Sequence, residues 1–150
     1  MNLTVPEYVE GRGLIKGKSV LITAAAGAGI GYSAAVRAVE EGARAIVLSD
    51  IHDRRLAEAV DKLKQDTGLE NVAGFVGNVA VEDDVRGLID FAWEAMEGVD
   101  VLINNAGLGT SRSLIEMEDE EWNRVLDVTL GGTMRMTRYM MQMMKKHGQG

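Results

Sequence analysis

The sequence contains no cysteine and only two histidines, His52 and His147, which lie far apart in the chain. Disulfide bridges and thiolate chemistry are therefore excluded. The two histidines show no zinc-ligand spacing, so no metal site is expected. Because a chain without cysteine is compatible with a reducing compartment, we expect a cytoplasmic location.

Basic residues are also scarce. The chain has 16 lysines and arginines against 23 acidic residues and a net charge of −7, so no nucleic-acid partner is expected. No run reaches the roughly 18 apolar residues that a membrane span needs, and no secretory signal is expected at the N-terminus. The single proline, Pro6, lies in residues 1–16, which we interpret as an N-terminal extension to one domain over residues 17–150.

The stretch Lys18–Gly31 is the most informative part of the sequence. Its apolar run Val20–Ile22 predicts a buried parallel strand, and the residues Thr23–Gly31 that follow have almost no side-chain volume. A helical pattern begins after Gly31. A strand, a small-residue turn and a helix N-terminus together allow backbone N–H groups to approach a phosphate. A tight packing turn without a ligand is the alternative.

Strands and helices are predicted to alternate along the chain, which indicates an α/β fold with a doubly wound parallel sheet. In such sheets ligands bind beyond the carboxyl ends of the strands. The polar and small residues of interest all follow strand ends: Thr23–Gly31, Asp50, Asn78 and Asn104–Gly107. The expected strands are 20–22, 45–48, 72–76 and 99–103, and the expected helices are 31–41, a helix capped by Asp53 and ending at Gly68, 82–97, and 119–147.

Two motifs resemble those of the short-chain dehydrogenase/reductase family. Thr23–Gly31 is similar to the family's cofactor loop, T-G-x-x-x-G-I-G, and Asn104–Gly107 matches its N-N-A-G motif. The resemblance implies an NAD(P)-binding Rossmann fold and hydride transfer between nicotinamide and a secondary alcohol or ketone as substrate. It implies that Asn104 stabilises the sheet, and it implies cofactor contacts from Thr23, Ala25, Gly27, Gly29, Ile30, Gly31, Asp50, Asn78, Val79, Asn105, Ala106, Gly107 and Val128.

Asp50 lies about 20 residues past the turn, where a dinucleotide fold places an acid against the adenosine ribose. A carboxylate there repels a 2′-phosphate by on the order of 4 kcal/mol at 4 Å and an effective dielectric near 20. NAD is therefore expected in preference to NADP. Arg54 and Arg55 favour the opposite outcome if one of them pairs with the phosphate, although a solvated first helical turn is the simpler interpretation.

The turn departs from the family pattern. It has one extra residue, and Ala24 replaces a glycine, a variant similar to that of a branch acting on CoA-linked or steroid-derived substrates. Thr129 stands where the family has an asparagine that supports proton transfer, so only a supporting role is expected for its hydroxyl.

The family's catalytic Y-x-x-x-K motif does not occur in this chain. The residues four positions after its tyrosines Tyr8, Tyr32 and Tyr139 are Arg12, Val36 and Met143. We therefore expect no catalytic residue within the chain, a sheet that is incomplete on its C-terminal side, and no activity from these 150 residues alone.

The expected helix over 119–147 is interrupted by Gly131–Gly132 and carries six of the nine methionines between Met134 and Met144. Core or subunit-interface packing explains them best. The family resemblance implies a homodimer or homotetramer through this helix. Two other functions remain open: a non-catalytic nucleotide-binding or oligomerisation module, and an S-adenosylmethionine-dependent methyltransferase.

Overall fold

Four parallel strands form the centre of the structure, a computed structural model that describes residues 6–148. They lie in the order β3-β2-β1-β4, with Val20 of β1 opposite both Ile46 of β2 and Val101 of β4. The parallel sheet and its flanking helices confirm the predicted fold class. The strands are β1 (Ser19–Thr23), β2 (Ala45–Asp50), β3 (Val72–Val76) and β4 (Val101–Ile103).

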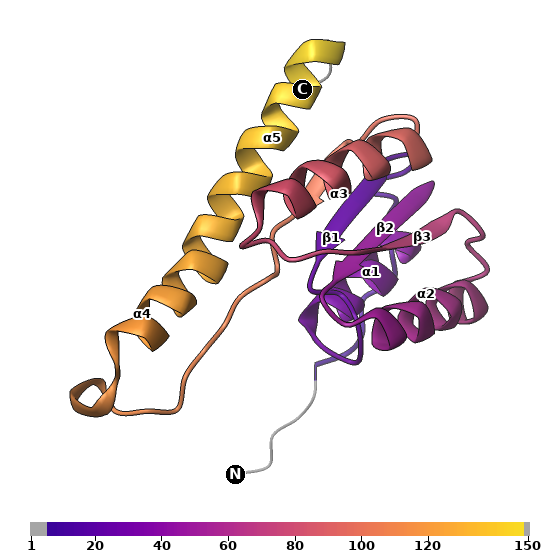
Figure 1. Ribbon diagram of the computed structural model, residues 1–150. Coiled ribbons are helices and arrows are strands. Elements are labelled where there is room, and N and C mark those ends of the chain that lie inside the picture. The colour runs from indigo at the N-terminus through magenta and orange to yellow at the C-terminus, as the bar shows by residue number, and fades with distance from the viewer. Residues whose placement is uncertain (1–5, 149–150) are drawn as a thin grey trace.

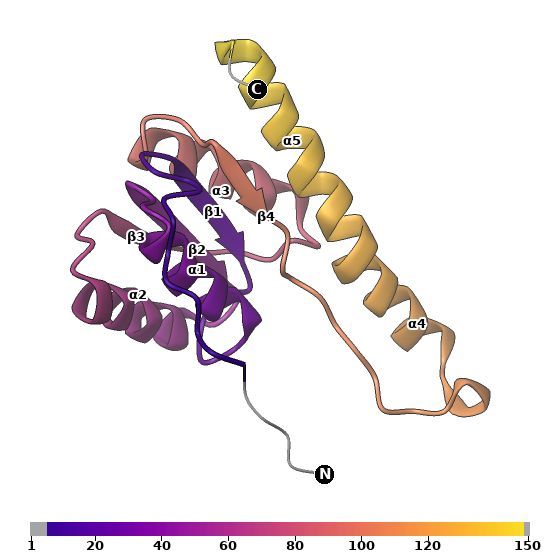
Figure 2. The ribbon, with the colours of Figure 1, turned by 180° about the vertical axis from the view of Figure 1, so that it is seen from behind.

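Helices cover both faces of the sheet (Figures 1 and 2). Helices α1 (Ile30–Glu40) and α2 (Asp53–Thr67) pack on the face that carries Val20 and Ile22. Helix α3 (Glu82–Ala95) packs on the opposite face with Leu21, together with α5 (Gly132–His147). Because both faces are covered, all five residues of β1 are buried, which explains its unbroken run of apolar side chains.

The helical segment predicted over 119–147 is one rod that extends past the sheet, but its hydrogen bonding changes midway (Figure 2). Helix α4 (Asp119–Leu126) runs into a π-helical turn, η2 (Asp127–Gly131), and then into α5. A short 3₁₀ turn, η1 (Leu114–Glu116), precedes it. The expected interruption at Gly131–Gly132 is thus the end of a π turn, and it is also a close contact. A Cβ on Gly132 would lie 2.6 Å from Cγ2 of Val79.

Most element boundaries differ from the prediction by one or two residues, and two of these differences have a physical reason. Helix α2 begins at Asp53, and His52 occupies the N-cap position without a side-chain capping bond. The capping bond expected from Asp53 is therefore absent. Its carboxylate lies in the first turn, where it acts through the helix dipole. Strand β4 begins at Val101 and not at Val99. Before it, the Asp100 carboxylate accepts the Ser19 N–H at 2.9 Å in place of a backbone partner. Burial raises the pKa of Asp100, but the bonds from Ser19 and Lys18 outweigh it and lower that pKa.

The predicted N-terminal extension is fixed to the end of α1 over its described part, residues 6–16; residues 1–5 lie outside the described residues. The Glu41 carboxylate accepts the backbone N–H groups of Arg12 at 2.8 Å and Leu14 at 2.9 Å, and it pairs with Arg37. The bonds from Leu14 and Arg12 lower the pKa of Glu41 to about 2. Within residues 6–148, none of the helices combines the length and apolar character needed to span a bilayer.

Candidate functional site

A cavity of about 560 Å³ opens at the carboxyl ends of the strands. That volume lies within the roughly 300–1,000 Å³ typical of small-molecule sites. The cavity brings together residues that follow β1, β2, β3 and β4 with residues from the start of the long helix. It is lined by Ala24, Ser49, Asp50, Ile51, His52, Arg55, Gly77, Asn78, Val79, Ala80, Ala106, Gly107, Leu108, Arg124, Asp127 and Val128.

Six of the thirteen residues expected at a cofactor line this cavity: Asp50, Asn78, Val79, Ala106, Gly107 and Val128. The remaining seven do not, and they fall into two groups. Thr23, Ala25, Gly31 and Asn105 take part in packing and hydrogen bonding around the turn. Gly27, Gly29 and Ile30 are exposed beside the cavity.

Asp50 uses both carboxylate oxygens within the protein. Its Oδ2 accepts the Ala26 N–H at 3.1 Å, and its Oδ1 accepts the His52 N–H at 3.1 Å. An ionised carboxylate offers about four lone-pair sites, so each oxygen can accept one further bond. The carboxylate can therefore hold the turn and still accept the two hydroxyls of a ribose.

The turn after β1 is held from two sides. Ala24 has a φ of 52°, a left-handed conformation that side chains other than glycine rarely adopt. The Nδ2 group of Asn105 donates to the carbonyls of Thr23 at 3.1 Å and Ala24 at 2.9 Å. The Ala25 N–H donates to the Ser49 carbonyl at 3.0 Å. These bonds together hold Ala24 in its strained conformation, and strained residues held in this way are common at functional sites.

The glycines of the turn have different surroundings. A Cβ on Gly31 would lie 2.7 Å from both the Ala24 carbonyl oxygen and Asn105 Nδ2, so Gly31 is required for packing. A Cβ on Gly27 or Gly29 would have no protein atom within 4 Å. Gly27 also has a φ of 93°, which favours glycine. Gly27 and Gly29 therefore leave the outer side of the turn open to a ligand.

Thr23 joins the ends of β1 and β4. Its hydroxyl accepts the N–H groups of Asn105 and Ala106, both at 3.0 Å, and its side chain is almost fully buried. Ala25 is buried as well. Thr23 and Ala25 therefore lie beneath the turn and do not line the cavity.

The contacts of Asn104 and Asn105 both differ from those expected, and neither residue lines the cavity. Asn105, expected at the cofactor, binds backbone carbonyls across to β1, which is the role expected of Asn104. Asn104 donates to Oγ1 of Thr137 on α5 at 3.1 Å, and its Oδ1 is buried without a partner among the described residues. Successive side chains of extended backbone point to opposite faces, which places one asparagine toward the turn and the other toward α5.

Asn78 forms the turn that its Gly-Asn sequence predicted. Its Oδ1 accepts the Ala80 N–H at 2.9 Å, and its own N–H donates to Asp84 at 2.9 Å. The carbonyl end of the side chain is thereby fixed, and its NH₂ group is left to donate into the cavity.

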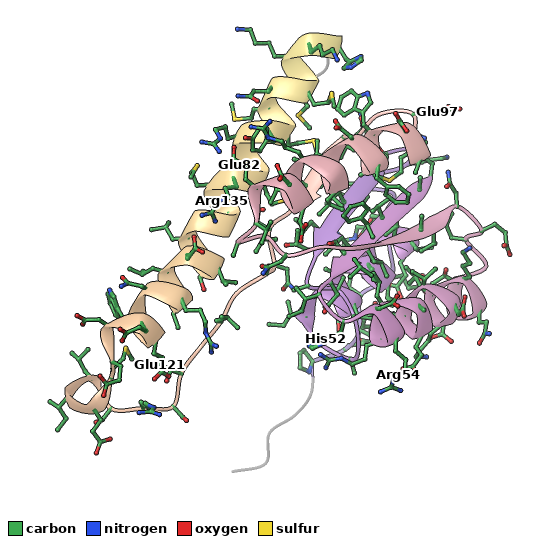
Figure 3. The ribbon with its side chains drawn as sticks, in the orientation of Figure 1. His52, Arg54, Glu82, Glu97, Glu121 and Arg135 are labelled. Atoms are coloured by element: carbon green, nitrogen blue, oxygen red, sulfur yellow. The ribbon has the colours of Figure 1, made fainter. Side chains whose placement is uncertain are left out.

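Thr129 lies in the π turn, outside the cavity wall, and its hydroxyl holds the neighbouring loop. Oγ1 of Thr129 accepts the Leu108 N–H at 3.1 Å, and Leu108 itself lines the cavity. The π turn is tied to the rest of the site by Arg135 (Figure 3), whose guanidinium pairs with Asp127 at 2.5 Å and reaches the Val79 carbonyl at 3.4 Å. The Thr129 hydroxyl is thus already bonded and acts on the shape of the loop.

Several residues that line the cavity were not expected there, above all His52, while Arg55 was considered as a partner for a 2′-phosphate with a solvated helical turn as the simpler interpretation. His52 is exposed, as expected of a surface residue, and it also lines the cavity beside the start of α2 (Figure 3). Arg54 points away from the molecule and pairs with Glu58 at 2.8 Å. Arg55 makes no ion pair within residues 6–148 and faces the cavity. The only available signal was their position directly after the acid that ends β2.

The residues present fit a dinucleotide. Helix α1 starts beside the open turn with no side-chain cap and no acid in its first turn, so its free N–H groups can receive a pyrophosphate. Asp50 offers acceptors for a ribose, and Asn78 offers a donor for a base edge.

Comparison with known proteins gives the same result. Residues 18–150 match the family model described as short chain dehydrogenase. The chain is 48% identical over 139 residues to a Mycobacterium tuberculosis (5R,7aS)-5-hydroxy-7a-methyl-1-oxo-2,3,5,6,7,7a-hexahydro-1H-indene-carboxyl-CoA reductase, covering 92% of this chain and 52% of that protein. The chain therefore spans about half the length of that relative.

Two solved structures resemble the chain closely. A short chain dehydrogenase from Mycobacterium smegmatis is 49% identical with a TM-score of 0.85, over 91% of this chain and 56% of that one. The L-sorbose reductase of Gluconobacter frateurii, complexed with NADPH and L-sorbose, is 32% identical with a TM-score of 0.78, over 89% of this chain and 50% of that one.

Proposed function

The chain belongs to the short-chain dehydrogenase family, and we propose that it is the cofactor-binding part of an NAD(P)-dependent oxidoreductase. The observation that carries the proposal is the convergence of all four strand ends on one cavity with the Asp50 carboxylate at its wall. A packing turn without a ligand would not need an open glycine side next to an uncapped helix end. The cytoplasmic location expected from the sequence is part of the same proposal.

Each part of the site holds one part of the cofactor. The N–H groups at the start of α1 bind the pyrophosphate, Asp50 accepts from the adenosine ribose, and the Asn78 NH₂ group donates to the base. Ala106 and Gly107 leave space for the nicotinamide half, and Thr129 fixes the loop that carries them. When bound, the nicotinamide accepts or supplies a hydride at the carbon of a secondary alcohol or ketone.

General acid/base catalysis is not assigned to any residue of this chain. No described side chain at the cavity corresponds to the tyrosine and lysine of the family's Y-x-x-x-K motif, and none of the three tyrosines lines it. We expect these 150 residues to bind the cofactor without turnover. Turnover of an alcohol with NAD by this chain would show that the reactive groups have been assigned incorrectly.

We propose NAD as the preferred cofactor because the Asp50 carboxylate lines the cavity at the end of β2 and would repel a 2′-phosphate bound beside it. The repulsion, on the order of 4 kcal/mol at close range, is partly offset by Arg55 on the same wall. Fluorescence titration should give a lower Kd for NADH than for NADPH. Titration with AMP and with adenosine 2′,5′-bisphosphate is the matched control, because the same preference must appear if Asp50 causes it. Tighter binding of NADPH would refute the assignment, and no binding of either dinucleotide would refute the proposed function.

We infer the substrate class from the mycobacterial relative, which is named as a reductase of a hydroxy-oxo-indene-carboxyl-CoA compound. The remodelled turn with Ala24 and an extra residue fits the same branch. A CoA-linked polycyclic ketone is therefore the first compound to test with the complete enzyme.

Exposed apolar side chains along α4, η2 and α5 support self-association as a homodimer or homotetramer. They include Trp122, Leu126, Leu130, Met134 and Met141. The same surface is the observation that favours the second candidate, a non-catalytic oligomerisation module. Light scattering combined with NADH titration separates the two, because the module predicts assembly without dinucleotide binding.

A further inference from the structure

The Asp50 carboxylate is bonded to the turn itself, and this contact goes beyond ribose recognition. Its Oδ2 accepts the Ala26 N–H at 3.1 Å, while its Oδ1 accepts the N–H of His52 at the start of α2. One side chain at the end of β2 therefore connects the turn after β1 to the turn after β2.

The turn needs such support because its backbone is strained. Ala24 adopts a φ of 52° without the freedom of glycine. On one side the Asn105 amide holds the Ala24 carbonyl at 2.9 Å. On the other side, two residues later, Asp50 holds the Ala26 N–H. One contact is therefore on the strained residue itself, and the other lies two residues after it.

The hydrogen bonds that hold the turn also determine which of its backbone N–H groups remain available to an anion. Asp50 takes up the Ala26 N–H, and Ser49 takes up the Ala25 N–H at 3.0 Å. The backbone that follows, from Gly27 to the first turn of α1, has open space at Gly27 and Gly29 and no side-chain cap on the helix. The anion-binding groups are therefore presented by a turn whose first half is anchored to β2.

We propose that Asp50 is a positioning residue for the pyrophosphate-binding turn, in addition to its contact with the adenosine ribose. This inference rests on the proposed function. It has a consequence for cofactor engineering: replacing Asp50 to admit a 2′-phosphate should also weaken binding of the pyrophosphate that both cofactors share.

The test uses inorganic pyrophosphate, which has no ribose and no base. If Asp50 only binds ribose, Asp50→Ala removes a negative charge and leaves pyrophosphate affinity unchanged or higher. If Asp50 positions the turn, the same variant loses pyrophosphate affinity by about fivefold or more, the effect of one lost net hydrogen bond. Asp53→Ala is the matched control, because it removes the same charge three residues away, and Asp53 forms no hydrogen bond to the turn among the described residues.

A second measurement covers the case in which Asp50→Ala folds poorly. Asp50→Asn keeps the size of the side chain but has one oxygen, so it can accept only one of the two N–H groups. Amide hydrogen exchange should then become faster at Ala26 or His52 in the free protein, while the Asp53→Ala control leaves both unchanged. Unchanged exchange at both amides, or pyrophosphate affinity that is kept or increased in Asp50→Ala, would overturn the inference. Wild-type protein that binds neither pyrophosphate nor NADH would instead refute the proposed function.

Discussion

Two glycines of the same turn, Gly31 and Gly29, should respond in opposite ways to the same substitution. A methyl group on Gly31 would lie 2.7 Å from the Ala24 carbonyl oxygen and 2.7 Å from Asn105 Nδ2. The carbonyl is backbone, and the amide is fixed by bonds at 2.9 and 3.1 Å, so neither can move away at low cost. A methyl group on Gly29 would meet no protein atom within 4 Å.

The magnitudes follow from these contacts. Overpacking costs about 1–3 kcal/mol, and losing one of the Asn105 bonds adds about 1 kcal/mol. Gly31→Ala should therefore lower the free energy of unfolding by about 2–4 kcal/mol, which corresponds to a fall in Tm of roughly 4–16 °C at this chain length. Gly29→Ala should stay within about 1 kcal/mol of wild type, since Gly29 occupies the N-cap position, where alanine is only modestly disfavoured.

Thermal and urea unfolding measure the loss of stability expected for Gly31→Ala, and NADH titration measures the loss of binding expected for Gly29→Ala. Gly29→Ala should fold normally but bind NADH more weakly, because its methyl group occupies the open side of the turn. Equal stability of Gly31→Ala and wild type would contradict the packing described for Gly31. NADH binding that is unaffected in Gly29→Ala would place the dinucleotide elsewhere.

Two further predictions concern the edges of the site and the N-terminal segment. Thr129→Val removes the acceptor for the Leu108 N–H and should speed hydrogen exchange at that amide while leaving the Tm within a few degrees; unchanged exchange at Leu108 would contradict the role of Thr129. Glu41 has a folded pKa of about 2 against a usual 4.5, so its stabilising contribution is fully present above pH 4.5 and is lost as the pH falls toward 2. Glu41→Gln should reduce stability at pH 7 and flatten the acid dependence over that window in urea unfolding at several pH values; an unchanged acid profile would show that the N–H bonds from Arg12 and Leu14 are not sensitive to its charge.

The sequence predicted the fold because its signals are local and periodic. The apolar run Val20–Ile22 and the small residues after it determine a buried strand and a turn without reference to the rest of the chain. Asp50 was found for the same reason, since its place at the end of β2 follows from the strand pattern alone. Parallel strands bring their carboxyl ends to one edge, so the position of the site followed from the fold.

Hydrogen-bond partners could not be predicted in the same way. Whether Asn104 or Asn105 reaches β1 depends on which face each side chain takes where β4 ends, and that depends on the structure around it. The bond between Asp50 and Ala26 spans 24 residues and follows from the path of the turn. Helix α2 begins one residue earlier than a cap at Asp53 would have required, so His52 takes the cap position, and it also lines the cavity.

The π turn at Asp127–Gly131 determines the direction in which the side chains of α5 point relative to those of α4. A five-residue turn shifts the side chains that follow by about one position, or roughly 100°, relative to an uninterrupted α-helix. This shift lets α4 supply Arg124 to the cavity while α5 directs Met136 and Met140 into the contact with α3. Deletion of one residue from Asp127–Gly131 would restore regular α-helical hydrogen bonding. It would also rotate the side chains of either α4 or α5 away from their present contacts. The π turn therefore allows one continuous helical segment to line the cavity and to pack against α3.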